Sequence, residues 1–175
     1  KEDDPKKTLK RMENLGELKF IRPDLRFTKK SQALFDSVKK VTAWFKLAYL
    51  KKRALDVWLI YLMALLDGLS VKNIQAVCKD FVFRKGEEMR LVSYKKDGPG
   101  IIRFLKKSGG VPPSRIYERL EPVSYEAILA IMAKSASKTA EKRISDFLTK
   151  YNGMRLRING GDLEAIGVRE GPGYR

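Results

Sequence analysis

The most constraining feature of the sequence is the run ALDVWLIYLMALLDG at residues 54–68, which is apolar nearly all the way round a helix. A helix without a polar face is stable only where it is buried, in the core of a protein or in a membrane. The run is shorter than the ~20 apolar residues that span a bilayer, and no other uninterrupted apolar stretch of the sequence reaches that length. It therefore predicts a core helix, and we expect no membrane partner.

The remaining segments place apolar residues at the three- and four-residue spacing of helices. One helix is predicted from Pro5, with Asp4 as its N-cap, to Gly16; a long amphipathic helix follows from Ser31, and Ser70 is a suitable N-cap for a later one. Because DGPG, SGGVPP, EPVS and SASK are turn-forming stretches, they separate further helices predicted at 85–94, 99–107, 113–120, 124–134 and 138–151. FIRPDLRF (20–27) and MRLRI (154–158) are predicted to be extended.

The closing stretch INGGDLEAIGVREGPGYR (158–175) contains two glycine-rich turns. Asp162 is a suitable N-cap for a short helix, Gly167 a left-handed C-cap, and Pro172 the first residue of another helix. The glycines either form tight helix turns only or clamp a phosphate with the flanking Arg169 and Arg175. The sequence thus predicts an all-α fold, a series of short helices packed pairwise into an elongated array with glycine-rich helix turns at its C-terminal end.

The charge of the chain indicates a polyanionic partner. Lysine and arginine number 37 and aspartate and glutamate 21, a net charge of +16, whereas ordinary small domains carry roughly 2 to 8. The excess comes in short clusters, any one of which is consistent with a merely solvated helix surface. Together they favour a nucleic acid, which a strong positive field attracts. The clusters are Lys6-Lys7 with Lys10-Arg11, Lys29-Lys30, Lys39-Lys40, Lys51-Lys52-Arg53, Lys95-Lys96 and Lys106-Lys107.

No catalytic or metal site is predicted. The chain has no histidine, the commonest general base and metal ligand, and its single cysteine, Cys78, excludes a disulfide or a zinc framework. No phosphate-binding loop, HExxH or G-x-S-x-G motif is present. The acidic run EDD at residues 2–4 is better explained by the dipole of the following helix than by magnesium. A reduced, cytoplasmic protein is expected.

Four segments in order resemble bacterial tRNA nucleotidyltransferases. These are DDPKKTLKRMENLGELKFIRPDL (3–25), WLIYLMALLDGLS (58–70), PSRIYERLEPVSYEAILAIMA (113–133) and KRISDFLTKYNGMRLRINGGDLEAIGVREGPGYR (142–175). The last contains a Gly-x-Asp-Leu-x-x-Leu/Ile-Gly-x-x-x-Gly-Pro run that resembles the family's. Its matching residues are Gly160, Gly161, Asp162, Leu163, Ile166, Gly167, Gly171 and Pro172. The sequence is similar to the C-terminal helical region of CCA-adding or A-adding enzymes, or of a poly(A) polymerase of that superfamily.

The resemblance implies a division of labour within a longer polypeptide. Residues 1–110 would form a helical body and residues 111–175 a helical tail that binds the tRNA elbow. The catalytic head and neck, which would use Mg²⁺ and ATP or CTP, are expected to precede Lys1. The body and tail would hold the acceptor stem and TΨC arm of tRNA through phosphates while the head adds A or CCA to the 3′ end.

The RNA contacts expected on this basis come mainly from the C-terminal segment. They are Lys51, Lys52, Arg53, Arg143, Arg155, Arg157, Gly160, Gly161, Arg169, Gly171, Gly173 and Arg175. Two other classes of function remain open from the residues alone. One is a helical adaptor whose basic surface meets an acidic protein, and the other is a DNA-binding helix-hairpin-helix protein.

Overall fold

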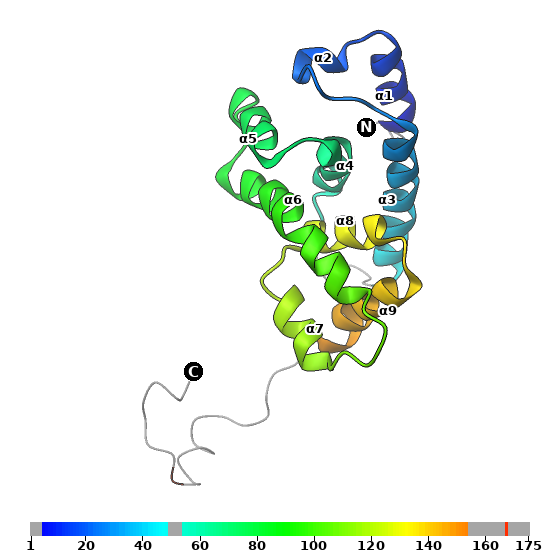
Figure 1. Cartoon of the computed structure of the whole chain (residues 1–175), viewed down its shortest axis with the longest axis vertical. Helices are drawn as coiled ribbons and strands as arrows, with labels where there is room; N and C mark the ends of the chain where they lie inside the picture. Colours follow the sequence, from blue (N-terminus) through cyan, green and yellow to red (C-terminus); the bar gives the residue numbers. More distant parts are fainter. Residues whose placement is uncertain (1–4, 49–53, 154–166, 168–175) are drawn as a thin grey trace.

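The structure is a computed structural model that describes residues 5–48, 54–153 and 167. Within these residues every regular element is helical, which confirms the predicted all-α class (Figure 1). The helices are α1 (Pro5–Asn14), α2 (Leu18–Ile21), α3 (Lys29–Ala48), α4 (Val57–Leu65), α5 (Val71–Asp80), α6 (Lys85–Leu105), α7 (Pro113–Leu120), α8 (Tyr125–Ser135) and α9 (Lys138–Asp146). A 3-10 turn, η1 (Leu66–Gly68), follows α4, and a π-helical turn, η2 (Phe147–Tyr151), follows α9.

The predicted core helix at 54–68 is confirmed as α4 with η1. Leu59, Ile60 and Met63 are fully buried in the middle of α4, and Leu66 of η1 is buried too. Helix α4 packs against α3, α6 and α8. Other helices therefore cover the apolar surface of α4 on several sides. No helix within the described residues is long and apolar enough to cross a membrane.

Helix α8 is the most deeply buried element of the fold. Every residue from 126 to 133 is buried, and α8 packs against α3, α4, α6 and α9. In Figure 1 it lies across the middle of the molecule, with α1 and α2 at one end and α7 at the other. The helices α3, α4, α6 and α9 therefore share α8 as a common packing partner.

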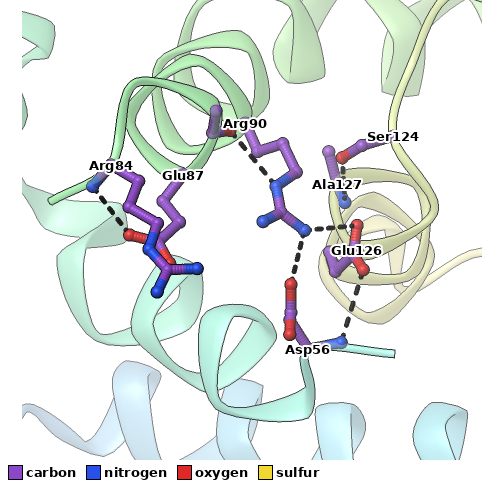
Figure 2. Close-up of polar contacts among 8 residues, drawn as sticks. Asp56, Arg84, Glu87, Arg90, Ser124, Glu126 and Ala127 are labelled. Carbon is purple, nitrogen blue, oxygen red and sulfur yellow. Dashed lines mark hydrogen bonds and ion pairs between the residues drawn. The ribbon is translucent and has the colours of Figure 1, made fainter. Parts of the chain in front are cut away.

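One charged residue, Glu126, is buried with α8, and a small ion network compensates it (Figure 2). Nη1 of Arg90, on α6, lies 3.3 Å from a Glu126 oxygen and 2.8 Å from Asp56, which precedes α4. The backbone N–H of Asp56 also donates to Glu126, at 3.4 Å. Burial alone lowers the pKa of Arg90, but its hydrogen bonds to Asp56 and Glu126 outweigh that cost and raise the pKa above its ordinary value. The network joins α4, α6 and α8 at their N-terminal ends.

Serine side chains cap several helices of the described residues. The Ser70 hydroxyl accepts the backbone N–H of Asn73 at the start of α5, at 3.2 Å, as predicted. Ser124 makes the same bond to Ala127 at the start of α8, which Figure 2 shows beside Glu126. Asp4, the predicted cap of α1, lies outside the described residues. These caps satisfy N–H groups that a helix itself leaves without partners.

Helix α6 differs from the prediction, because DGPG does not end a helix there. A single helix runs from Lys85 to Leu105 with Pro99 inside it. Tyr94, Gly98, Ile101 and Leu105 all face the core at three- and four-residue intervals, and an added Cβ on Gly98 would lie 3.5 Å from Ile131 of α8. Burial of this face against α8 outweighs the backbone hydrogen bond that proline removes.

FIRPDLRF is only partly extended. Phe20 and Ile21 belong to the short helix α2, and the extended path begins at Arg22, whose φ is −154° and ψ 138°. The predicted stop at Gly16 is confirmed by its φ of +71°. The N–H groups of Glu17 and Gly16 donate to the carbonyls of Met12 and Glu13, at 2.9 and 3.0 Å. These two hydrogen bonds together form a glycine C-cap, which turns the chain directly into α2.

The predicted division at residues 110 and 111 remains a proposal. The buried side chains on both sides of it form one apolar cluster, since α8 packs against α3, α4 and α6. Gly167 has the positive φ predicted for a left-handed C-cap, +81°. The MRLRI connector and the rest of the closing glycine-rich stretch lie outside the described residues.

The continuity of α6 is testable at Gly100. We expect Gly100→Ala to raise the free energy of unfolding by about 0.5–1 kcal/mol, because alanine is the better helix former in a helix interior. The nearest atom to the added Cβ is the far end of Arg119, at 3.6 Å, so the methyl group fits. Gly109→Ala is the matched control, expected to destabilise because φ there is +119°. Urea unfolding measures both, and a loss of stability in Gly100→Ala would show that α6 breaks at DGPG.

The ion network makes a second prediction. Arg90→Met leaves the buried Glu126 carboxylate without its cation, and we expect a loss of about 2 kcal/mol in unfolding free energy. This is below the ~3–5 kcal/mol of a fully buried pair because water still reaches Arg90 and Asp56. Adding Glu126→Gln to Arg90→Met should recover part of the loss, since no buried charge then remains unpaired and the Asp56 carboxylate is half exposed to water. A double variant less stable than Arg90→Met would contradict this account.

Candidate nucleic-acid interface

Of the predicted RNA contacts, only Arg143 lies within the described residues. Lys51, Lys52, Arg53, Arg155, Arg157, Gly160, Gly161, Arg169, Gly171, Gly173 and Arg175 lie outside them. Their roles stay predictions, as does the choice between a phosphate clamp and simple helix turns at the C-terminal end.

Arg143 of α9 binds the C-terminal end of α6. Its Nη1 donates to the carbonyls of Leu105 and Lys107, at 2.8 and 3.0 Å, and its Nη2 to that of Gly109, at 2.6 Å. The last carbonyls of a helix lack partners within the helix and carry partial negative charge, which a guanidinium satisfies well. The structure therefore gives Arg143 a stabilising role that its position in the sequence did not indicate, and its contact with RNA stays untested.

This role of Arg143 is testable by unfolding. We expect Arg143→Ala to lower the unfolding free energy by about 1–2 kcal/mol, on the scale of partly exposed charged hydrogen bonds. Arg143→Lys should lose most of the same energy, because one ammonium cannot span three carbonyls. Lys142→Ala, at the exposed neighbouring position, is the control and should leave stability unchanged within ~0.5 kcal/mol. Full stability of Arg143→Ala would refute the role of Arg143 as a cap.

A basic groove lies between α3, the end of α8 and α9. Its volume is about 590 Å³, and the side chains that line it include Lys40 and Trp44 of α3 and Lys138, Glu141 and Lys142 of α9. Lys138 and Lys142 are four residues apart on α9, so they lie on the same helical face, opposite Lys40. We call this the α3–α9 groove.

The α3–α9 groove has uncompensated positive charge. Three lysines and one glutamate line it, and none of the ion pairs formed within the described ranges involves Lys40, Lys138 or Lys142. All three lysines are exposed, so their ammonium groups are available to an anion. The half-buried Trp44 adds an indole ring, a suitable surface for a base or ribose.

Sequence analysis found only part of this groove. Lys40 belongs to one of the basic clusters noted above, but Lys138 and Lys142 were not predicted to bind RNA. Their i, i+4 spacing on a predicted helix was a usable signal, since it places two positive charges on one face. The sequence alone does not show that α9 lies beside α3. The two helices come together because each of them packs against α8.

The described part of the chain contains neither a metal-binding cluster nor a reactive thiol. No group of three or more histidine, cysteine, aspartate or glutamate side chains there is arranged to hold a metal ion. Cys78 is buried, and burial raises the pKa of its thiol, so the reactive thiolate is disfavoured. The basic groove is thus the feature that best fits a binding function.

Comparisons with known proteins point to one kind of enzyme. No family model matches the sequence. The A-adding tRNA nucleotidyltransferase of Geobacter sulfurreducens is 31% identical over 179 residues, which cover 100% of this chain and 20% of that protein. The chain therefore spans about a fifth of the length of this relative.

Solved structures share the fold. A Thermotoga maritima CCA-adding enzyme complexed with tRNA has a TM-score of 0.76 at 21% identity, over 99% of this chain and 41% of that chain. A CCA-adding enzyme in complex with CTP has a TM-score of 0.73 at 22% identity, over 97% of this chain and 40% of that one. At such identities the structures establish the helical fold alone. The chain is thus related along its whole length to an A-adding tRNA nucleotidyltransferase, and it has the fold of the matching part of CCA-adding enzymes.

Proposed function

We propose that this chain is a tRNA-binding region of a tRNA nucleotidyltransferase, an enzyme that adds A or CCA to tRNA 3′ ends. The observation that carries the proposal is the relation to an A-adding enzyme along the whole chain. The net charge of +16 and the α3–α9 groove supply a surface for the RNA backbone. In this proposal the chain holds the acceptor stem and TΨC arm in the cytoplasm while a catalytic head of the same polypeptide performs the chemistry.

Recognition would be independent of base sequence. Lysine ammonium groups contact phosphates as point charges, and such contacts position an RNA without reading its bases. Side chains cannot read the deep major groove of an A-form stem, so shape, phosphates and 2′-hydroxyls are what a helical surface meets. Lys40, Lys138 and Lys142 would contact phosphates on either side of the groove.

Nucleotide and magnesium chemistry is assigned to the head in this proposal. The related structures include CCA-adding enzymes complexed with CTP and with ATP. Within the described residues no cluster of acidic side chains offers the oxygen ligands that Mg²⁺ prefers. We therefore assign to this chain the holding of tRNA and to the head the binding of Mg²⁺, ATP and CTP.

The proposal predicts steeply salt-dependent binding of tRNA. If about five phosphates are neutralised, the slope of log K against log salt should approach −4 to −5 by counterion release. Replacing Lys40, Lys138 and Lys142 with glutamine should make the slope shallower by roughly one per lost phosphate contact. Filter binding at several salt concentrations measures both. The matched control replaces Lys72, Lys79 and Lys85, exposed lysines of α5 and the start of α6, and removes the same charge.

The competing functions give different outcomes in the same assay. A helix-hairpin-helix protein should bind duplex DNA at least as tightly as tRNA or an acceptor–TΨC minihelix. An adaptor should bind neither nucleic acid with a steep slope. If the groove variant and the control variant change the salt-dependence slope equally, the RNA binds elsewhere on the surface.

A further inference from the structure

A second cavity, distinct from the α3–α9 groove, lies at the other end of α3. It has a volume of about 400 Å³ between the 22–28 loop, the first turn of α3, η1, α6 and α8. Its charged lining residues are Asp24, Arg26, Lys30, Asp67, Lys95 and Lys134. We call it the Asp67 cleft.

Asp67, at the centre of the cleft, already has its partners. Its side chain is 14% exposed, and its Oδ1 accepts hydrogen bonds from Lys134 Nζ at 2.5 Å and from the Tyr94 hydroxyl at 2.8 Å. The Lys134 ammonium also lies 5.6 Å from the centre of the Tyr94 ring. Among the ion pairs within the described residues, Asp67 forms one, with Lys134.

The other cations have only neutral acceptors or none. Lys95 Nζ donates to the backbone carbonyl of Asp67 at 2.7 Å. Arg26 Nη1 donates to two backbone carbonyls, both at 2.8 Å, and Lys30 has no ion pair within the part of the chain that the structure describes. The second carboxylate, Asp24, accepts the side-chain amide of Asn73 at 2.6 Å. Four cations and two carboxylates therefore line the cleft and leave it a net charge of +2.

Burial and the charges of the cleft act together on the pKa of Lys95. Burial lowers the pKa of its ammonium first, the charge of Asp67 raises it, and the charges of Lys134 and Lys30 lower it further. The net effect is a pKa below the ordinary value for lysine. A bound anion would supply the missing counter-charge and hydrogen-bond acceptors for Lys30 and Lys95 together.

We propose that the Asp67 cleft binds a phosphate group. Four cationic side chains from separate elements line this small concave site, which suits a compact anion with oxygens on every side. If the chain binds tRNA as proposed above, this phosphate belongs to the RNA backbone. Lys30 and Lys40 are ten residues apart on α3, about 15 Å by the rise of a helix, so the cleft and the α3–α9 groove lie along one helix.

A pair of matched variants tests the cleft. The cleft variant is Lys30→Gln with Lys95→Gln. The control variant, Lys29→Gln with Lys96→Gln, removes the same charge from exposed sequence neighbours that do not line the cleft. We expect the tRNA dissociation constant to rise roughly tenfold in the cleft variant, the scale of one lost charged hydrogen bond, and less than about threefold in the control.

Inorganic phosphate gives an independent readout of the same site. Titrated at constant ionic strength, phosphate should raise the melting temperature of the wild type and the control variant more than that of the cleft variant. Should the double substitution prevent folding, Lys30→Gln against Lys29→Gln repeats the comparison at two exposed positions of α3.

The outcomes separate this inference from the proposed function. If the wild type binds tRNA and both variants weaken that binding equally, the phosphate site in the cleft is refuted and the proposed function stands. Failure of the wild type to bind tRNA overturns the proposed function, and the phosphate titration then decides the cleft by itself. Equal melting shifts in the wild type and the cleft variant refute the phosphate site.

Discussion

The burial of α8 is the constraint on which the rest of the fold depends. A helix whose residues 126–133 are all buried needs neighbours on every side, and α3, α4, α6 and α9 provide them. The same burial requires a partner for Glu126, which Arg90 supplies from α6. Both basic cavities follow from this arrangement, because the C-terminal end of α8 lines each of them: Met132 and Ala133 in the groove, Lys134 in the cleft.

The uneven distribution of charge between the interior and the surface explains how a protein with a net charge of +16 has a compact core. Three of the buried or half-buried carboxylates, Glu126, Asp56 and Asp67, are each paired with a cation from another element. Once these acidic groups are used inside, the lysines of the two cavities keep an excess of positive charge. The pairing of charges in the interior and the excess of positive charge at the surface both follow from the same amino-acid composition. Such a surface suits a polyanion.

The sequence predicted those elements whose evidence is local. Apolar spacing and caps located α4, α5, α7 and α8, and Gly16 marked its turn, because each signal depends on neighbours within a few residues. The interruption of α6 was predicted wrongly, since the turn chemistry of Gly98 and Pro99 is local whereas the packing of Tyr94, Ile101 and Leu105 on α8 is not. The two cavities were not predicted as sites for the same reason, although some of their lysines belong to the basic clusters noted in the sequence. Their lysines come from α3, α6, α8 and α9, which only the tertiary fold brings together.

Three arginines and four lysines of the described residues have different tasks, and the difference bears on where RNA contacts should be sought. Arg22, Arg90 and Arg143 bind carboxylate, amide or carbonyl oxygens of other elements, as the planar fork of a guanidinium allows. Lys40, Lys138, Lys142 and Lys30 bridge no two elements through ion pairs within the described ranges. Among these residues, therefore, the three arginines join separate elements, and the four lysines leave their ammonium groups open to a phosphate, whereas Lys6 and Lys134 show that lysine can also join two elements. An arginine of the described residues is therefore a candidate for RNA contact only once its hydrogen bonds and ion pairs to other elements have been taken into account.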